Sequence, residues 1–165
     1  IRKYRTRREE KIMRKLDFTP KIISLDDKNM EIKMEFINGP LVKDIFDKLD
    51  NKKLKEICLE IGKKISIMHD LGIIHGDLTT SNIILKDNGI YFIDFGLGFV
   101  SNRIEDKATD LRLLFQILKS KHYDNFDSAY EYIINGYSRN ENSKIVLDWL
   151  ENKVEKRGRY KRKNK

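Results

Sequence analysis

Along the first quarter of the chain, hydrophobic and polar residues follow the pattern of one helix and one hairpin. Residues 2–16 are densely charged with few apolar positions, which predicts a helix that has a narrow buried stripe and stops before Pro20. Residues 22–25 are mostly apolar, and after a polar turn at 26–29 apolar and charged residues alternate from Met30 to Phe36. An alternation of period two predicts a strand with one buried face, so we expect a β-hairpin here.

Helical periodicity dominates the rest of the chain, apart from one more hairpin. Apolar residues recur at helical spacing from Leu54 to Met68, and Gly72 is a natural stop for that helix. Residues 82–86 and 90–94 form the second predicted hairpin, with Asp87-Asn88-Gly89 as its loop. Three further helices are predicted over residues 111–118, 126–137 and 145–154. Strands first and helices last indicate an α+β fold.

The bulk composition is that of one globular domain. The chain has 165 residues, of which 39% are hydrophobic and 36% are charged, so it can bury one core. Its single cysteine, Cys58, cannot form an internal disulfide, which fits a reducing cytosol. No apolar stretch approaches the roughly 18 residues that a membrane helix needs, so we expect a cytoplasmic protein that has no membrane partner.

The excess positive charge is confined to the two ends of the chain. The formal net charge is +8, yet residues 1–15 carry +6 and residues 156–165 carry +7, so the 140 residues between them carry −5. A solvated surface and a disordered tail are the simpler explanation of such segments. The alternative is contact with nucleic-acid phosphates through the basic residues of the tail, which are Arg157, Arg159, Lys161, Arg162 and Lys163.

Two short motifs carry the candidate chemistry. The segment from His75 to Asn82 reads His-Gly-Asp-Leu-Thr-Thr-Ser-Asn and matches the catalytic loop of protein kinases. Asp94-Phe95-Gly96 follows twelve residues after Asn82, directly behind a predicted strand. At a usage of roughly one in twenty per position, a chance match of six specified residues at fixed spacing is remote. The motifs therefore predict a protein-kinase-like fold that uses ATP and Mg²⁺.

The expected roles of these residues follow from phosphoryl transfer, in which the protein mainly positions the reactants and neutralises charge on the phosphoryl oxygens. Asp94 and Asn82 are the candidate Mg²⁺ ligands. Asp77 is the candidate catalytic residue that orients or deprotonates the attacking hydroxyl or water. His75 is a second candidate within the loop, for which bracing the loop is a more ordinary role than carrying a proton.

The register of the second hairpin decides whether the candidate metal ligands meet. A three-residue loop at 87–89 pairs Lys86 with Ile90. Four positions further along the two strands, the same register places Asn82 opposite Asp94. Both side chains would then converge on one point. A two-residue turn would shift this register by one residue.

Several elements of conventional protein kinases are not found in the chain. A glycine-rich phosphate loop and the nucleotide lysine should precede the first helix, so we expect further sequence upstream of Ile1. Gly76 stands where conventional protein kinases carry Arg, as in aminoglycoside and choline phosphotransferases, so control through a phosphorylated activation loop is not expected. Both prolines precede the motifs, which excludes an Ala-Pro-Glu element after them.

Nearly the whole chain resembles the small kinase of the KEOPS (EKC) complex, which supports threonylcarbamoylation of tRNA. The resemblance rests on Arg5-Thr6 with Glu9, on Met34 to Gly39, on Glu105 to Leu111 and on Arg157 to Arg159. By position it implies that Glu9 pairs with the upstream lysine and that the backbone of Glu35 and Ile37 meets adenine. The residues that it implies as structural support are Asp110, beneath the catalytic loop, with Phe95 and Gly96. An ion pair within the first helix is the simpler alternative for Glu9, and a helix-dipole contact is the alternative for Asp110.

The resemblance also implies partners and an activity. It implies docking to, or fusion with, the threonylcarbamoyl-transferring ATPase subunit, contact of the basic tail with tRNA, and a Ser/Thr kinase or ATPase activity. We expect a remnant of a kinase N-lobe with the hinge over residues 1–37, a mainly helical C-lobe over 38–155 and a basic tail over 156–165. A small-molecule phosphotransferase of the aminoglycoside or choline type and a non-enzymatic tRNA-binding scaffold stay open as alternatives. The short helical region after Gly96 disfavours the first alternative, and the intact motif residues disfavour the second.

Overall fold

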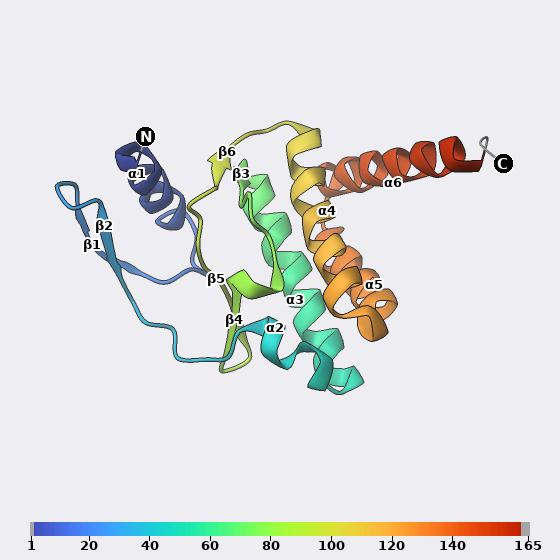
Figure 1. Cartoon of the computed structure of the whole chain (residues 1–165), viewed down its shortest axis with the longest axis horizontal. Coiled ribbons are helices and arrows are strands. Elements are labelled where there is room, and N and C mark those ends of the chain that lie inside the picture. The colour runs from blue at the N-terminus through green and yellow to red at the C-terminus, as the bar shows by residue number, and fades with distance from the viewer. Residues whose placement is uncertain (1, 163–165) are drawn as a thin grey trace.

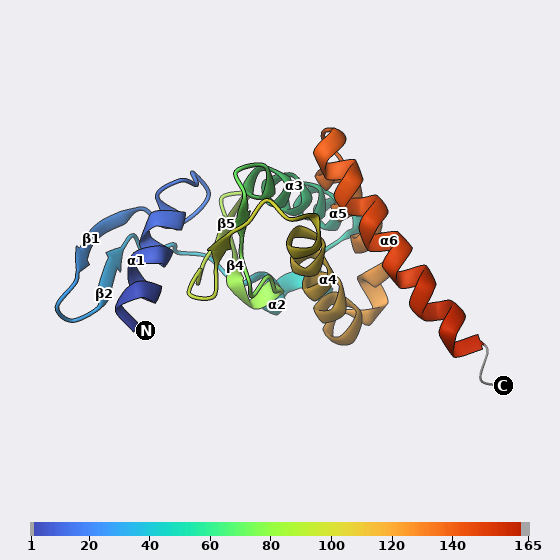
Figure 2. The ribbon, with the colours of Figure 1, turned by 90° about the horizontal axis from the view of Figure 1, so that it is seen from above.

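The protein is described here from a computed structural model, which covers residues 2–162, with side chains from residue 4 to residue 152. Figures 1 and 2 show α1 and a two-stranded hairpin at one end of the molecule and a body of helices at the other end. The elements are α1 (Arg2–Met13), β1 (Ile22–Asp26), β2 (Glu31–Met34), α2 (Val42–Ile45), η1 (Phe46–Lys48), α3 (Asn51–Asp70), β3 (Ile73–Ile74), η2 (Thr80–Asn82), β4 (Ile83–Lys86), β5 (Gly89–Phe92), β6 (Phe99–Val100), α4 (Ile104–Lys121), η3 (Tyr123–Asn125), α5 (Phe126–Tyr137) and α6 (Glu141–Arg162). The predicted α+β class is confirmed, with one hairpin before α2 and α3, a second hairpin after them, and a helical region from α4 to α6.

The first helix and hairpin form as the sequence pattern predicts. β1 and β2 pair antiparallel, and in β2 Ile32 and Met34 are partly buried while Glu31 and Lys33 are exposed. Helix α1 ends at Met13, and only hydrogen-bonded turns continue to Leu16, so the regular helix is three residues shorter than predicted. The alternation therefore sets the buried face of β2 correctly.

Helix α3 organises the helical body. Asp50 caps it by accepting a hydrogen bond from the Lys53 N–H at 2.7 Å, and Gly72, with φ +68°, follows its last turn as predicted. Its backbone touches that of α5, because a Cβ on Gly62 would lie 2.1 Å from the Ile133 carbonyl oxygen. The two helices approach this closely only because a glycine stands at the crossing.

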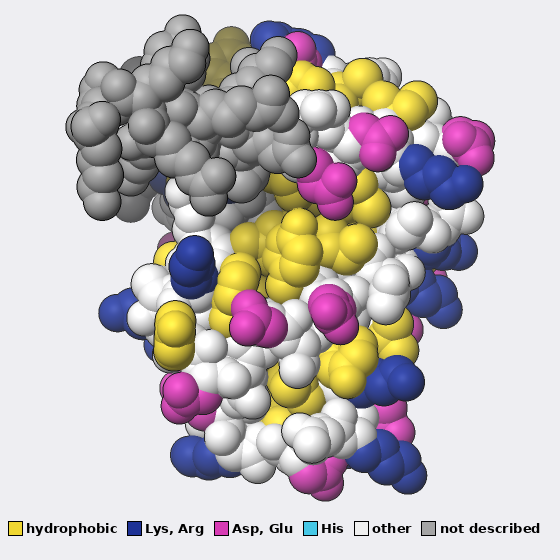
Figure 3. Space-filling model, turned by 90° about the vertical axis from the view of Figure 1, so that its right-hand side faces the viewer, with side chains coloured by type: hydrophobic (Ala, Val, Ile, Leu, Met, Phe, Trp, Pro, Cys, Tyr) yellow, Lys and Arg dark blue, Asp and Glu magenta, His cyan; other side chains and the backbone are white. Residues whose placement is uncertain are grey.

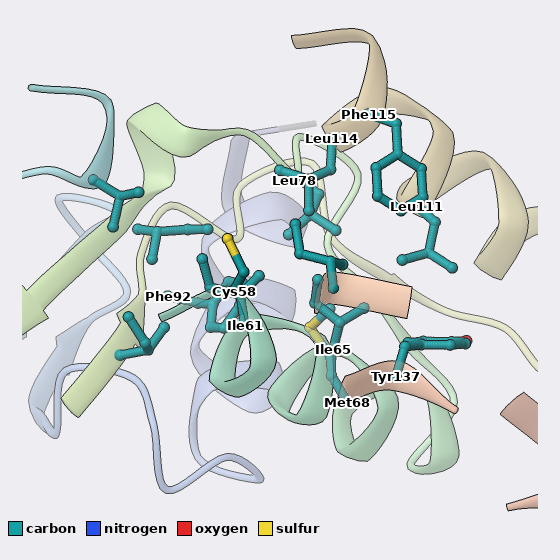
Figure 4. Close-up of a cluster of buried hydrophobic side chains, with 14 of the residues drawn as sticks. Cys58, Ile61, Ile65, Met68, Leu78, Phe92, Leu111, Leu114, Phe115 and Tyr137 are labelled. Atoms are coloured by element: carbon teal, nitrogen blue, oxygen red, sulfur yellow. The ribbon is translucent and has the colours of Figure 1, made fainter. Parts of the chain in front are cut away.

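The core lies between α3, α4, α5 and the second hairpin (Figure 4). Its labelled members come from α3, the catalytic loop, β5, α4 and α5, and are Cys58, Ile61, Ile65, Met68, Leu78, Phe92, Leu111, Leu114, Phe115 and Tyr137. Burying an aliphatic or aromatic side chain of this size contributes about 1.5–3 kcal/mol as an upper bound. This core fixes the elements on which the catalytic loop is mounted.

The predicted register of the second hairpin is wrong by one residue. Lys86 pairs with Gly89 and not with Ile90, so the turn has two residues, Asp87 and Asn88, with φ of 48° and 62°. A two-residue type I′ turn requires positive φ at both central positions, which Asp and Asn tolerate. Asn82 therefore lies opposite Ile93, whose N–H donates to the Asn82 carbonyl oxygen at 3.0 Å, and Asp94 is one residue further along.

Two features of the C-terminal half were not predicted. β6 pairs antiparallel with β3, so the chain after the hairpin is not purely helical. Helix α6 begins at Glu141 and runs to Arg162, so the backbone of residues 156–162 continues the helix and is not a separate tail (Figure 1). The side chains of the predicted nucleic-acid contacts Arg157, Arg159, Lys161 and Arg162, and Lys163 as a whole, lie outside the described residues, so these contacts stay predictions.

The surface on the side of α4, α5 and α6 carries an apolar hollow. It has a volume of about 540 Å³, and Phe115, Phe126, Tyr130 and Leu150 line it. Figure 3 shows hydrophobic side chains gathered on this side of the molecule, with acidic side chains among them. Within the described residues no helix is both long enough and apolar enough to span a bilayer.

Candidate active site

The catalytic loop, residues 75–82, runs from β3 to β4 over the buried end of Asp110. Asp110 is 3% exposed and lies in the second turn of α4. Its carboxylate accepts hydrogen bonds from the backbone N–H groups of His75 at 2.8 Å and Gly76 at 3.0 Å. A buried carboxylate bound by two backbone N–H groups holds the start of the loop in one conformation.

Asp77 and Asn82, at the two ends of the loop, are joined by their side chains. The amide nitrogen of Asn82 donates to the carbonyl oxygen of Asp77 and to its Oδ2, both at 2.9 Å. Because the amide is planar, its Oδ1 faces away from Asp77 and can accept a cation. Asn82 is only 9% exposed, so its orientation is set by these bonds.

Asp94 follows β5 by two residues and comes directly after Ile93, the partner of Asn82. The hydrogen bond between Ile93 and Asn82 fixes the chain immediately before Asp94, which has φ +58° and an exposed side chain. Its Oδ1 accepts a hydrogen bond from the Gly96 N–H at 3.3 Å. The hairpin therefore joins Asn82 to the residue before Asp94, and convergence of the Asn82 and Asp94 side chains stays a prediction.

This donor set fits Mg²⁺ held together with a nucleotide. Mg²⁺ prefers oxygen ligands and is usually bound by one or two carboxylates plus substrate phosphates and water. Asp94 and Asn82 supply one carboxylate and one amide oxygen. Among the described residues no group of three or more His, Cys, Asp or Glu side chains could form a closed metal cage. Phosphates and water would have to complete the coordination.

His75 has both ring nitrogens engaged below the loop. Its Nε2 lies 3.1 Å from the Ile93 carbonyl oxygen, and its Nδ1 accepts from the Asp77 N–H at 3.3 Å, which corresponds to the tautomer with hydrogen on Nε2. Burial lowers the pKa of His75, so the ring is neutral at physiological pH. Phe95 packs against the ring with centroids 4.5 Å apart. In this arrangement neither nitrogen faces the solvent side of the loop.

Glu9 extends from α1 to the Asp94-Phe95-Gly96 turn. The pKa of Glu9 is raised, mainly by burial and further by the charge of Asp94. Arg5 and a hydrogen bond from the Phe95 backbone oppose this rise in part. The neighbouring Glu10 forms an ion pair with Arg14, the first residue after α1. Of the two adjacent acids, Glu9 is therefore the one beside the candidate metal site.

The candidate adenine segment joins β2 to α2. The Glu35 N–H donates to the Lys21 carbonyl oxygen at 2.8 Å, so the hairpin uses this donor. Ile37 is 5% exposed, whereas Phe36 between them is 84% exposed. Contact of this backbone with adenine stays a prediction.

Two buried histidines have partners that sequence reasoning did not find. His69 lies 3.2 Å from Asp110 Oδ2 and 2.8 Å from the Tyr137 hydroxyl. His122 likewise connects the carboxylate of Asp47 with the hydroxyl of Thr80. These partners lie between 41 and 75 residues away in the chain, so no spacing pattern in one sequence points to them.

A helix and hairpin followed by a helical body, with this loop and the Asp94 turn between them, define a protein-kinase-like protein. A family model described as "Protein kinase domain" matches residues 2–135. Among solved structures, that of WaaP in complex with acyl carrier protein superposes with a TM-score of 0.64 over 92% of this chain and 76% of that chain. Its sequence identity is 17%, so it shows the fold alone.

More similar sequences narrow the family. "KEOPS complex subunit Bud32" of Pyrococcus abyssi is 39% identical over 170 residues, which cover 99% of this chain and 77% of that protein. "EKC/KEOPS complex subunit bud32" of Dictyostelium discoideum is 41% identical over 86% of this chain and 59% of its own length. The "Probable bifunctional tRNA threonylcarbamoyladenosine biosynthesis protein" of Methanococcus vannielii is 45% identical over 94% of this chain, yet the chain spans only 29% of that protein. The chain belongs to the Bud32 family of protein kinases.

Proposed function

We propose that the protein is an ATP-dependent phosphotransferase, a Ser/Thr kinase or ATPase, whose reaction centre consists of Asp77, Asn82 and Asp94. The observation that carries this proposal is the joint placement of these three groups. Asn82 bonds to Asp77 through its amide nitrogen and pairs across the hairpin with Ile93, the neighbour of Asp94. Phosphoryl transfer needs such positioned acids more than it needs covalent chemistry from the protein.

Each side chain has a separate task in this proposal. Bound Mg²⁺·ATP would supply the phosphoryl group and the metal charge that neutralises it. Asp94 and Oδ1 of Asn82 would hold the cation. Asp77 would orient the attacking hydroxyl or water and accept its proton on Oδ1, because Oδ2 is bound to the Asn82 amide. His75, neutral and bonded at both nitrogens, would brace the loop.

The remaining candidates would bind the nucleotide or support the centre. Glu9 would pair with the nucleotide lysine, and its position beside Asp94 and the Phe95 N–H supports this role. The Glu35 carbonyl and the Ile37 N–H would meet adenine. Asp110, Phe95 and Gly96 would keep the loop and the metal-binding turn in place.

We further propose that this activity serves threonylcarbamoyladenosine biosynthesis in tRNA. The names of the similar proteins support this context, and the bifunctional relatives support a close association with the threonylcarbamoyl-transferring ATPase subunit, docked or fused. The basic end of the chain would contact tRNA phosphates, and the helical backbone of α6 would carry it away from the body (Figure 2).

ATP hydrolysis and phosphate transfer by the full-length protein test the reaction centre. We expect Asp94→Asn to reduce turnover by roughly two orders of magnitude or more, because a neutral amide lacks the negative charge with which a carboxylate binds Mg²⁺. Asp87→Asn is the matched control, since Asp87 is an exposed acid with positive φ on the same hairpin. Equal turnover in all three proteins would refute the proposal, and robust transfer to a small molecule would favour an aminoglycoside- or choline-kinase type of enzyme.

Binding of tRNA at several salt concentrations tests the basic segment. Deletion of residues 156–165 should weaken binding and reduce the dependence of log K on log salt, because fewer phosphates would be neutralised. Unchanged affinity and slope would show that the segment makes no phosphate contacts. Stimulation of ATP hydrolysis by the ATPase subunit and tRNA, absent in Asp94→Asn, would support the proposed context.

A further inference from the structure

The catalytic loop is anchored at a second point, five residues beyond His75. The Thr80 hydroxyl lies 3.3 Å from Nε2 of His122, and Nδ1 of His122 lies 2.8 Å from Oδ2 of Asp47. Thr80 is 2% exposed and His122 is 4% exposed. A carboxylate in η1, an imidazole at the end of α4 and a hydroxyl in the loop therefore form one hydrogen-bonded chain.

The direction of these hydrogen bonds follows from the groups themselves. An ionised Asp47 can only accept, so the proton on Nδ1 of His122 is donated to it. Nε2 then carries a lone pair and accepts the Thr80 hydroxyl proton. The carboxylate thus selects the tautomer of His122, and that tautomer presents one acceptor to the loop.

His122 is itself held in place on several sides. It follows the last residue of α4, and its backbone N–H donates to the Leu118 carbonyl oxygen at 2.8 Å. Its ring lies against Phe46, which is fully buried, with centroids 4.7 Å apart. A ring fixed by backbone, packing and a carboxylate is a rigid support for a loop.

Helix α4 consequently holds the loop at both ends. Asp110 binds the backbone at residues 75 and 76, and His122 binds Thr80.

A hollow of about 510 Å³ lies beside this second anchor. Asp47, Thr80 and His122 line it together with Thr79, Ser81, Lys43 and Lys121. Thr80 itself is buried, and its hydroxyl bonds to His122 in the wall of this hollow.

We propose that His122, oriented by Asp47, is a positioning residue for the metal-binding side of the reaction centre. Thr80 begins η2 and Asn82 ends it, and the Asn82 N–H donates to the Thr79 carbonyl oxygen at 3.0 Å. Fixing Thr80 fixes this turn, and the turn sets the Asn82 amide that binds Asp77. This inference rests on the proposed phosphotransferase activity.

Substitution of Thr80 tests the inference with less risk to folding than substitution of His122. Thr80→Val keeps the shape of the side chain and removes the hydroxyl. We expect kcat to fall about 10-fold, because the misplaced Asn82 amide both holds Asp77 and helps to bind the cation in the reaction step. Thr80→Ser should restore most of kcat, and Ser128→Ala, at an exposed position of α5, should stay within about twofold of wild type.

Amide hydrogen exchange gives a readout that does not require turnover. The Asn82 N–H should exchange about 10-fold faster in Thr80→Val than in wild type and regain protection in Thr80→Ser. If Thr80→Val matches wild type in kcat and in Asn82 exchange, the inference is wrong. If wild type and Asp94→Asn have the same turnover, the proposed activity fails instead, and the exchange data alone then decide whether His122 positions the turn.

Discussion

The guanidinium of Arg5 occupies the space in which a side chain at residue 96 would begin. An ideal Cβ on Gly96 would stand 2.6 Å from Nη2 of Arg5 and 3.1 Å from Oδ1 of Asp94. The glycine thus lets a residue of α1 pack directly against the turn that carries the candidate metal ligand. Glu9, one helical turn after Arg5, contacts the same turn, so α1 reaches it with one cation and one acid.

Alanine substitution should destabilise the protein less at Gly96 than at Gly76. In Gly96→Ala the new methyl group meets the end of a long side chain, so Arg5 can move aside, and we expect a loss below about 1 kcal/mol. In Gly76→Ala the methyl group would lie 2.5 Å from the Leu97 carbonyl oxygen at φ +81°, where neither backbone can yield easily. We expect a loss of about 1–3 kcal/mol in the free energy of unfolding, measured by urea denaturation. Equal losses of stability in the two variants would contradict this expected difference between Gly96 and Gly76.

Asp110→Asn should loosen the start of the catalytic loop. The amide can accept only one of the two backbone hydrogen bonds from His75 and Gly76, and its NH₂ group would face the other donor. We expect a loss of about 1–3 kcal/mol in the free energy of unfolding. Faster amide exchange at His75 and Gly76 should accompany it. Asp124→Asn, at an exposed position, is the control, and an equal loss there would remove the special role of Asp110.

Glu9 should make stability depend on pH. Burial raises its pKa above the ordinary value of 4.5, and the nearby charge of Asp94 adds to the rise. A folded-state pKa above the unfolded value means that the stabilisation is complete below the unfolded pKa and is lost as pH rises through the folded pKa. Relative to wild type, Glu9→Gln should therefore gain stability in urea titrations as pH rises above the ordinary pKa of 4.5. Glu10→Gln controls for the loss of one charge, and an identical profile would exclude a specific effect of Glu9.

The sequence predicts the elements of the fold well where their signal is local. The spacing from Leu54 to Met68 and the stop at Gly72 correspond to α3, because helix periodicity and capping involve neighbouring residues. The sequence predicts the second hairpin at the correct place but with the wrong register. The sequence does not tell whether the turn has two residues, Asp87 and Asn88, that both adopt positive φ. The observed register joins Asn82 to Ile93, the neighbour of Asp94.

Contacts between distant segments could not be predicted in the same way. β3 and β6 have two residues each, which is too short for an alternation to be visible. His122 and Asp47 lie 75 residues apart, and neither has a neighbour in the sequence that marks it as a partner. His122 becomes buried and meets the exposed Asp47 only when α4 and η1 pack together, so the second anchor of the loop appears only in three dimensions.

The crossing of α3 and α5 allows a prediction in which the sign of the effect is decisive. A Cβ on Gly62 would lie 2.1 Å from the Ile133 carbonyl oxygen, and one on Gly136 would lie 2.1 Å from the Leu59 carbonyl oxygen. In an uncrowded helix, Gly→Ala stabilises by about 0.5–1 kcal/mol. Here the backbones must separate, so each alanine should instead destabilise the protein by about 1–3 kcal/mol in guanidinium denaturation.

The double variant provides the sharper check. Once Gly62→Ala has separated the helices, Gly136→Ala should cost less than it does alone, because both methyl groups relieve the same crowding. Lys63→Ala, an exposed position on α3, should change stability by less than about 0.5 kcal/mol. Stabilisation by either glycine substitution would mean that α3 and α5 do not touch through their backbones. The core that carries the catalytic loop would then be packed differently from the arrangement described here.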